Sequence, residues 1–210
     1  MRTRILLADD HQLFRQGLRS MLPADEFEVV AEAADGQHAI SLARRHEPDI
    51  AVLDVSMPGL NGVDATREVL RASPHTRVVV LTMHSETPYV VGALASGARG
   101  YVVKSQPVSD VVQALREVSA GSVYVPPEYV KVLVDIHQSG ADRVVQPLSA
   151  RERQVLQLVA EGKTTKEIAY TLGVSFKTAE SHRTRIMSKL DIHETAGLVR
   201  YAIRNRMIEA

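Results

Sequence analysis

The chain contains no cysteine and no tryptophan, and only 4% of its 210 residues are aromatic. Without cysteine it can form no disulfide, no thiolate metal site and no cysteine nucleophile, a composition that suits a reducing compartment. The N-terminus has no long apolar run, because residues 5–8 are followed directly by Asp9 and Asp10. That stretch is too short for a signal peptide or a membrane span, so we interpret it as a buried strand.

The rest of the composition is ordinary for a folded protein, with 45% hydrophobic and 24% charged residues. The length exceeds the usual single-domain size of about 100–150 residues, which favours two small domains. The net charge of zero is unevenly distributed: residues 1–125 carry 12 Lys and Arg against 15 Asp and Glu, residues 126–146 carry 2 against 3, and residues 147–210 carry 11 against 7. A basic C-terminal part is the charge pattern of a nucleic-acid binder, although an excess of four charges is modest.

Short apolar runs alternate with helical patterns from residue 4 to about residue 119. The runs are four or five residues long, aliphatic or β-branched, and typical of parallel strands covered on both faces. They occupy residues 5–8, 27–31, 50–53, 78–81 and 100–103. This alternation predicts an α/β fold with a doubly wound, five-stranded parallel sheet, which binds ligands at the carboxyl ends of its strands.

The rest of the chain reads as a linker followed by a small all-α domain. Residues 139–147 contain glycine, polar residues and proline, and offer little to bury. We therefore predict a first domain at residues 1–122, a linker with one helix (about 128–137) at residues 123–146, and a helical domain at residues 147–210.

Local signals mark the ends of the helices in this last domain. Two capping boxes of the S/T-x-x-E type begin at Ser149 and Thr164, and Gly162 and Gly173 end the helices that follow. Ser175 can cap a third helix at about residues 176–190, and a fourth is expected at about 194–205. Apolar helical spacing assigns the following residues to the core: Ala160, Ile168, Ala169, Leu172, Val174, Ile186 and Leu190.

Chemically active side chains follow four of the five predicted strands. Asp9 and Asp10 follow the first strand, Asp54 ends the third, Thr82 ends the fourth, and Lys104 follows the fifth. Because the carboxyl ends of parallel strands meet at one edge, we expect these side chains to converge. Three adjacent carboxylates need a cation, and oxygen ligands suit Mg²⁺. Any one of these residues alone is more often a helix cap or a solvated side chain, so the prediction depends on the set.

The motifs around these residues resemble a known family. They are Ala8-Asp9-Asp10-His11, Asp54-Val-Ser-Met-Pro-Gly-Leu-Asn-Gly62, Leu81-Thr82 and Gly100-Tyr101-Val-Val-Lys104. Over residues 4–120 the chain resembles the flavodoxin-like receiver domain of bacterial two-component response regulators. The resemblance implies the following roles: Asp54 as phosphoacceptor; Asp9, Asp10, Asp54 and the backbone carbonyl of Ser56 as Mg²⁺ ligands; Lys104 as the partner of the phosphoryl group; Thr82 and Tyr101 as the switch pair.

The sequence departs from that family after Lys104. Many receivers have proline next, whereas Ser105 follows here and Pro107 comes later. A cis-proline at this junction is therefore not available.

Residues 148–206 resemble the LuxR-type DNA-binding domain of the FixJ/NarL subfamily. The motifs are Leu148-Ser-Ala-Arg-Glu-Arg153, Lys166-Glu-Ile-Ala169 and Val174-Ser-Phe-Lys-Thr-Ala-Glu-Ser-His-Arg183. The resemblance implies a recognition helix that starts near Phe176 and enters the major groove. The implied DNA contacts are Lys166, Lys177, Thr178, Ser181, Arg183, Arg185 and Lys189. The implied dimer contacts are Leu198, Val199 and Ala202.

Together these features predict a cytoplasmic bacterial transcription regulator. A sensor histidine kinase would phosphorylate Asp54 with Mg²⁺ as cofactor, and this would control homodimerisation and binding to paired half-sites in double-stranded DNA. The chain would not be a turnover enzyme beyond autophosphorylation from small donors and autodephosphorylation, and it would have no membrane partner. Two alternatives stay open: a phosphatase or phosphotransferase with Asp54 as nucleophile, although Ser56 stands where a second acid is expected, and a regulator that acts independently of phosphorylation.

Overall fold

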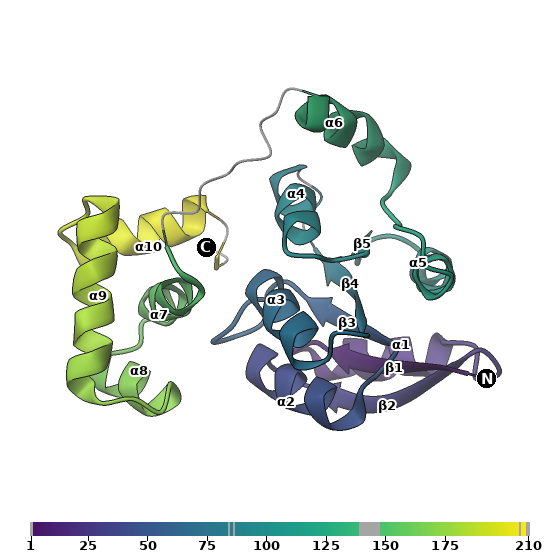
Figure 1. Ribbon diagram of the computed structural model, residues 1–210, viewed down its shortest axis with the longest axis horizontal. Coiled ribbons are helices and arrows are strands. Elements are labelled where there is room, and N and C mark those ends of the chain that lie inside the picture. The colour runs from purple at the N-terminus through teal and green to yellow at the C-terminus, as the bar shows by residue number, and fades with distance from the viewer. Residues whose placement is uncertain (1, 84, 86, 139–147, 206, 209–210) are drawn as a thin grey trace. The chain divides into compact units, whose positions relative to one another are not determined.

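The computed structural model describes residues 2–83, 85, 87–138, 148–205 and 207–208 (Figure 1). The chain divides into two compact units, Met1–Asp142 and Arg143–Ala210, and each is described by itself. The predicted domain boundary between residues 146 and 147 lies outside the described residues. Within the described part of the chain, no helix is both long and apolar enough to span a membrane.

The first unit is an α/β domain built on five parallel strands. The strands are β1 (Thr3–Ala8), β2 (Phe27–Ala33), β3 (Ile50–Asp54), β4 (Arg77–Thr82) and β5 (Gly100–Val103). The helices are α1 (Gln12–Met21), α2 (Gly36–His46), α3 (Gly62–Ala72), α4 (Thr87–Ala95), α5 (Val108–Ser119) and α6 (Pro127–Gln138). The strand order β2-β1-β3-β4-β5, with every pair parallel, confirms the predicted doubly wound sheet.

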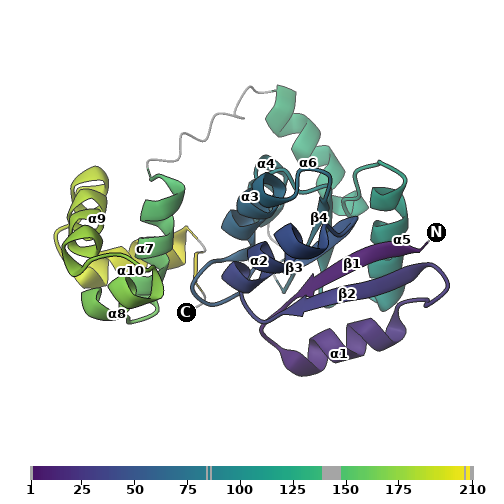
Figure 2. The same cartoon turned by 60° about the horizontal axis from the view of Figure 1, so that its bottom comes forward.

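Side chains of the strands alternate between two cores, one on each face of the sheet. In β1, Leu6 and Ala8 pack with α2, α3 and α4, whereas Ile5 and Leu7 pack with α1 and α5. Because successive side chains of a strand point to opposite faces, a run that is apolar at every position must be covered on both sides. Figure 2 shows α1 on one side of β1 and β2, and α2 and α3 on the other.

The segment after α5 continues the sheet before it becomes α6. The backbone N–H of Tyr124 donates to the carbonyl of Arg99 at 2.9 Å, and the N–H of Tyr101 donates to the carbonyl of Tyr124 at 3.0 Å. This short parallel bridge fixes where α6 begins. The helix predicted within the linker at about residues 128–137 is present as α6, but it packs on the first unit, where Tyr129 joins the core that contains α4.

The second unit is all helical. Its helices are α7 (Ala150–Ala160), α8 (Thr165–Thr171), α9 (Phe176–Leu190) and α10 (Thr195–Arg204). Both predicted capping boxes are present, because Ser149 and Thr164 each accept a hydrogen bond from the backbone N–H three residues later. Gly162 and Gly173 have φ of 81° and 62°, so each lies in the left-handed conformation that commonly ends a helix. All seven predicted core residues belong to the apolar cluster of this unit, which confirms that prediction.

Candidate functional site

The register of the sheet brings the ends of β1, β3 and β5 to one edge. Ala8 pairs with Leu53 in the sheet, so Asp9 and Asp54 follow at the same level. Thr82 pairs with Val103, and the backbone N–H of Lys104 donates to the Thr82 carbonyl at 2.6 Å. Residues that lie up to 95 positions apart in the sequence therefore surround one crevice.

A buried lysine connects the two inner carboxylates of this crevice. Lys104 Nζ lies 2.7 Å from Oδ2 of Asp9 and 2.9 Å from Oδ2 of Asp54. All three side chains are at most 6% exposed. The ammonium group also lies 4.8 Å from the centre of the Phe14 ring, a cation–π contact from α1 that the sequence analysis did not anticipate. A positive charge is thus held where the two carboxylates meet.

The crevice raises the pKa of both Asp54 and Lys104. Burial is the main cause for Asp54, and it outweighs the opposing effects of Lys104 and of the backbone N–H of Ser56 on the pKa. Burial alone would lower the pKa of Lys104, but Asp54 and Asp9 together raise it. Lys104 therefore stays charged. The ionised form of Asp54 is disfavoured unless a further positive charge binds in the crevice.

The donor set of the crevice fits a small divalent cation. Ligand atoms of Asp9, Asp10, His11 and Asp54 all lie within 4.8 Å of one another. Among the described residues, no hydrogen bond of good geometry reaches the buried Oδ1 of Asp54. A carboxylate oxygen that has lone pairs to offer, in a crevice where several carboxylates gather, is a suitable ligand for a cation such as Mg²⁺. His11 is 71% exposed and contacts Oδ1 of Asp10 through Nδ1 at 2.8 Å, so it orients a ligand rather than completing an oxygen set.

Thr82 and Tyr101, the predicted switch pair, are both fully buried in the structure. The Tyr101 ring meets the ring of Tyr129 edge to face, with centroids 6.1 Å apart and planes at 76°. The Tyr129 hydroxyl donates to the backbone carbonyl of Ser85, which follows β4. Tyr129 comes from α6, a helix that was assigned to the linker, so no feature of the sequence pointed to this contact.

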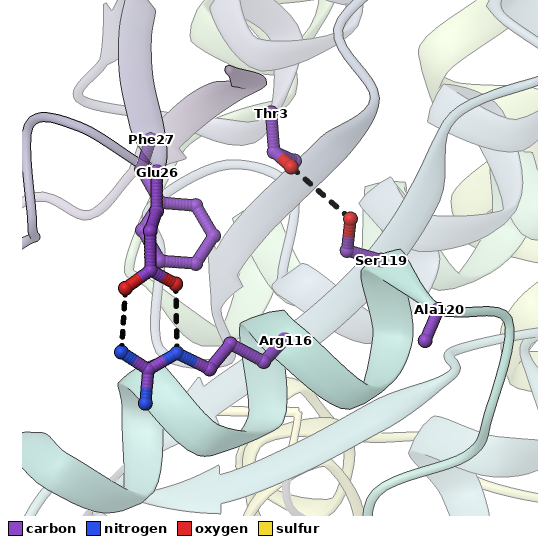
Figure 3. A pocket seen from close by; sticks show the side chains of 6 residues that line it. All are labelled: Thr3, Glu26, Phe27, Arg116, Ser119 and Ala120. Atoms are coloured by element: carbon purple, nitrogen blue, oxygen red, sulfur yellow. Dashed lines mark hydrogen bonds and ion pairs between the residues drawn. The ribbon is translucent and has the colours of Figure 1, made fainter. Parts of the chain in front are cut away.

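A second cavity, of about 250 Å³, lies at the opposite end of the sheet (Figure 3). Its polar side chains bond one another: Arg116 forms two hydrogen bonds with Glu26, at 2.6 and 2.7 Å, and Thr3 bonds Ser119 at 3.1 Å. None of the predicted site residues lines it.

In the second unit, α9 presents a polar surface opposite its buried side. Ala179 and Ile186 face the core, while Lys177, Thr178 and Arg185 are exposed. Because successive residues turn by about 100°, Lys177 and Ser181 project away from the buried stripe. Thr184, which the sequence analysis did not single out, shares this surface and is exposed. Figure 1 shows α7, α8 and α10 gathered along one side of α9, which leaves the other side uncovered within this unit.

Two other residues predicted to contact DNA, Arg183 and Lys189, have partners inside their own unit. The Arg183 guanidinium donates to the hydroxyl of Thr195 at the start of α10. Lys189 Nζ lies 2.7 Å from Oε2 of Glu152 on α7. Lys166 is exposed on α8. The exposed residues of α9 thus include Lys177, Thr178, Thr184 and Arg185, while Lys189 is 45% exposed but paired with Glu152.

The structure differs from the expected dimer contact at two of three positions. The side chains of Leu198 and Ala202 are 0% exposed and belong to the core of the second unit, and only Val199 is partly exposed. The resemblance implied a contact surface on this helix, but these two side chains pack in the core together with residues of α7. Leu198 and Ala202 therefore stabilise the fold and cannot form an exposed contact.

Comparison with known families assigns both units. A family model described as "Response regulator receiver domain" matches residues 5–116, and one described as "Bacterial regulatory proteins, luxR family" matches residues 146–202. The chain belongs to the response regulator family. This response regulator therefore combines a receiver domain with a LuxR-type helix-turn-helix domain, as the motifs predicted.

Curated relatives match this response regulator over nearly its whole length. The oxygen regulatory protein NreC of Staphylococcus carnosus is 37% identical over 98% of this chain and 99% of its own. The transcriptional regulatory protein DegU of Brevibacillus brevis is 32% identical over 98% of this chain and 94% of its own. The family is thus one of transcription regulators.

A solved structure of a relative includes DNA. RcsB from Salmonella enterica serovar Typhimurium, bound to the promoter rprA in the presence of phosphomimetic BeF3-, is 27% identical, with a TM-score of 0.62 over 96% of this chain and 98% of its own. The match extends over both domains of this response regulator.

Proposed function

We propose that Asp54 accepts a phosphoryl group from a sensor histidine kinase and that this event controls DNA binding by the second unit. The observation that most supports the proposal is Lys104, whose Nζ contacts both Asp54 and Asp9 within 2.9 Å. A cation at this place can pair with phosphoryl oxygens as negative charge accumulates.

The chemical step joins phosphorus to a carboxylate oxygen of Asp54. The bond from phosphorus to the nitrogen of a phosphohistidine, or to the carboxylate oxygen of acetyl phosphate, breaks, and its electron pair leaves with the donor. The Thr82 hydroxyl would donate to a phosphoryl oxygen, and Tyr101, which is buried on the neighbouring strand β5, would be its partner in the switch. Turnover of other substrates is not part of this proposal; the chain acts as acceptor, with at most autophosphorylation and autodephosphorylation.

Mg²⁺ is the proposed cofactor of this step. Asp9, Asp10, Asp54 and the backbone carbonyl of Ser56 would hold it, and the bound ion would neutralise the carboxylates and the incoming phosphoryl oxygens. The raised pKa of Asp54 supports a requirement for added positive charge.

The uncovered side of α9 is the proposed reading element for DNA. Lys177 and Arg185 can contact phosphates or guanine edges, and Thr178 and Ser181 can hydrogen-bond to either. Lys166 on α8 adds a cation. A phosphorylated homodimer would place two such helices on paired half-sites about one helical turn apart. It would act in the bacterial cytoplasm, where both the kinase and the DNA are accessible.

Phosphoryl incorporation tests the assignment of Asp54. The full chain is incubated with acetyl phosphate and Mg²⁺, and acid-labile phosphate is measured by intact mass. We expect incorporation in the parent and in the control Asp25→Asn, which changes an exposed aspartate outside the crevice, and none in Asp54→Asn. Equal incorporation in Asp54→Asn would show that the acceptor is a different residue.

Dimerisation tests the control mechanism. The oligomeric state and the affinity for promoter DNA are measured with and without the phosphodonor, in the parent and in Asp54→Asn. We expect the donor to increase both in the parent alone. If both are unchanged while Asp54 becomes phosphorylated, the alternative of a phosphorylation-independent regulator is correct.

A further inference from the structure

Arg15 on α1 contacts the backbone of the acidic crevice from outside. Its Nη1 donates a hydrogen bond to the backbone carbonyl of Asp9, and its Nε donates to Oε2 of Glu32 on β2 at 3.1 Å. The Arg15 side chain is only 13% exposed. A planar guanidinium donates to two neighbours in fixed directions, whereas the ammonium of a lysine is a point charge on a flexible stem and does not fix those directions.

The carbonyl that Arg15 holds belongs to the peptide between Asp9 and Asp10. The other polar groups of Asp9 are also fixed: its N–H donates to the Ala33 carbonyl at 3.2 Å, and Oδ1 accepts from the His11 N–H at 2.8 Å. Oδ2 contacts Lys104. The Asp9 carbonyl is thus held by Arg15, while the other polar groups of Asp9 are held by the sheet, the loop and Lys104. By fixing this carbonyl, Arg15 also fixes the orientation of the peptide that leads from Asp9 to Asp10.

Glu32 orients Arg15 and partly compensates its charge. In the sheet Glu32 pairs with Leu7, two residues before Asp9, so its carboxylate lies beside the end of β1. Its other oxygen, Oε1, accepts from Arg19 at 2.7 Å. Burial alone would raise the pKa of Glu32, but the two arginines lower it, so the carboxylate is ionised. Glu32 offsets part of the Arg15 charge, because its single negative charge is shared with Arg19, and Arg15 acts on the crevice chiefly through its hydrogen bond to the Asp9 carbonyl.

We propose that Arg15 is a positioning residue for divalent-cation binding, because it fixes the peptide that joins Asp9 to Asp10 and so directs both carboxylates at the ion. This inference rests on the proposed function of the crevice as a Mg²⁺ site. Mg²⁺ demands near-ideal octahedral geometry at short distances, whereas Ca²⁺ accepts irregular geometry. Groups that orient metal ligands from outside typically change metal affinity 10- to 100-fold when they are lost.

Metal binding by the full-length variants tests the proposal. The parent, Arg15→Ala and Arg15→Lys are titrated with MgCl₂ and, separately, CaCl₂, and binding is followed by the backbone amide NMR signals of residues 9–11. We expect the dissociation constant for Mg²⁺ to rise about 10-fold in both variants. The constant for Ca²⁺ should rise much less, which a general loss of structure would not produce.

Arg19→Ala is the matched control, because it removes an arginine from the same Glu32 carboxylate and the side chain is 58% exposed. We expect its Mg²⁺ affinity to equal that of the parent. Glu32→Gln, which weakens the hold on Arg15 without changing α1, is the second variant, and its loss of Mg²⁺ affinity should be intermediate. It decides the question if Arg15→Ala does not fold.

Three results would overturn the inference. Parent-like Mg²⁺ affinity in Arg15→Ala would show that the peptide needs no support. Restoration of affinity in Arg15→Lys would show that charge, not position, matters. Equal losses for Mg²⁺ and Ca²⁺ would indicate general damage. If the parent itself binds no Mg²⁺, the proposed function of the crevice fails, and this outcome is distinct from the other three.

Discussion

Gly62 lies directly behind the backbone of Asp54. A β-carbon at this position would be 2.1 Å from the Asp54 carbonyl oxygen and 2.8 Å from its carbonyl carbon. The N–H of Gly62 donates to the Val55 carbonyl at 3.0 Å, so the start of α3 is fastened to the turn that carries the acceptor. Backbone packed this closely leaves no room for any side chain, which explains glycine at this place.

We predict that Gly62→Ala lowers the free energy of unfolding by about 1–3 kcal/mol and reduces phosphoryl incorporation at Asp54, because α3 or the turn must move. Urea unfolding and phosphate incorporation measure the two effects. The control is Gly17→Ala in α1, where nothing lies within 4 Å of the added carbon. It should raise the free energy of unfolding by about 0.5–1 kcal/mol through helix propensity. Equal behaviour of the two variants would contradict the close approach.

Glu152 joins α7 to α9 through one buried carboxylate. It accepts from the Ser149 N–H at 2.8 Å and from Lys189 at 2.7 Å. Burial alone would raise the pKa of Glu152, but Lys189 and Ser149 together lower it from its usual 4.5. A carboxyl with a lowered pKa in the folded state contributes stability above its unfolded pKa, and this contribution is lost as the pH falls through the lowered value.

We therefore predict that Glu152→Gln destabilises the second unit by about 1–2 kcal/mol at pH 7. The difference from the parent should shrink as the pH falls below 4.5, the usual pKa of this carboxyl. Denaturation of the full chain, followed by NMR signals of α7–α9 at several pH values, measures it. Glu194→Gln, at an exposed helix start without a side-chain cap, is the control. A pH-independent difference would mean that the charge is not involved.

At this scale the sequence predicted which carboxylates and which lysine converge, because each follows a strand of a parallel sheet. It did not predict Phe14 under Lys104 or Arg15 beside Asp9. Both lie on α1. Which of its neighbours a helical side chain contacts depends on how the helix packs, and periodicity does not contain that information.

Among the elements, α6 departs most from its expected role. Its helical character was predicted, but Tyr129 attaches it to the first unit through the Tyr101 ring and the Ser85 carbonyl. The same helix exposes Val130 and Val134, at 50% and 47%. One face of α6 is thus packed and another is open, and a linker interpretation cannot distinguish them.

We predict that Tyr129→Ala releases α6 from the first unit. Hydrogen–deuterium exchange within residues 127–138 should become faster, because the variant loses both the ring contact and the hydroxyl bond. Tyr129→Phe, which keeps the ring and loses only the hydroxyl, should have a smaller effect. The control is Val130→Ala, which changes the neighbouring exposed residue and should leave the exchange rates equal to those of the parent. Unchanged exchange in Tyr129→Ala would show that other contacts hold the helix.

Over the whole molecule, charge is divided between the two units. The first 125 residues carry a net charge of −3 and residues 147–210 carry +4. The acidic unit holds the proposed cation site and the basic unit the proposed DNA surface. Each lysine or arginine that neutralises a DNA phosphate releases condensed counterions, so binding by the basic unit should weaken steeply with salt.

We predict that Lys177→Ala weakens promoter binding and, if the contact is to a phosphate, reduces the slope of log affinity against log salt by about 1. Fluorescence anisotropy of labelled promoter DNA at several salt concentrations measures both quantities. Lys131→Ala, which removes an exposed cation from α6 in the acidic unit, is the control and should leave the slope unchanged. An effect of Lys131→Ala as large as that of Lys177→Ala would contradict the assignment of DNA binding to α9.

The sequence by itself determined the two architectures, the helix caps at Ser149 and Thr164, and the convergence at Asp54. The architectures and the caps follow from local signals, since apolar periodicity and capping residues act over a few positions. The convergence at Asp54 follows from the geometry of a parallel sheet, in which the carboxyl ends of the strands meet at one edge. Only the tertiary structure decided that Tyr129 packs against Tyr101, that Arg15 holds the Asp9 carbonyl, and that Leu198 and Ala202 fill a core. The sequence shows that an apolar helix face or a long charged side chain needs a contact, but the residue that it contacts depends on how elements distant in the sequence pack.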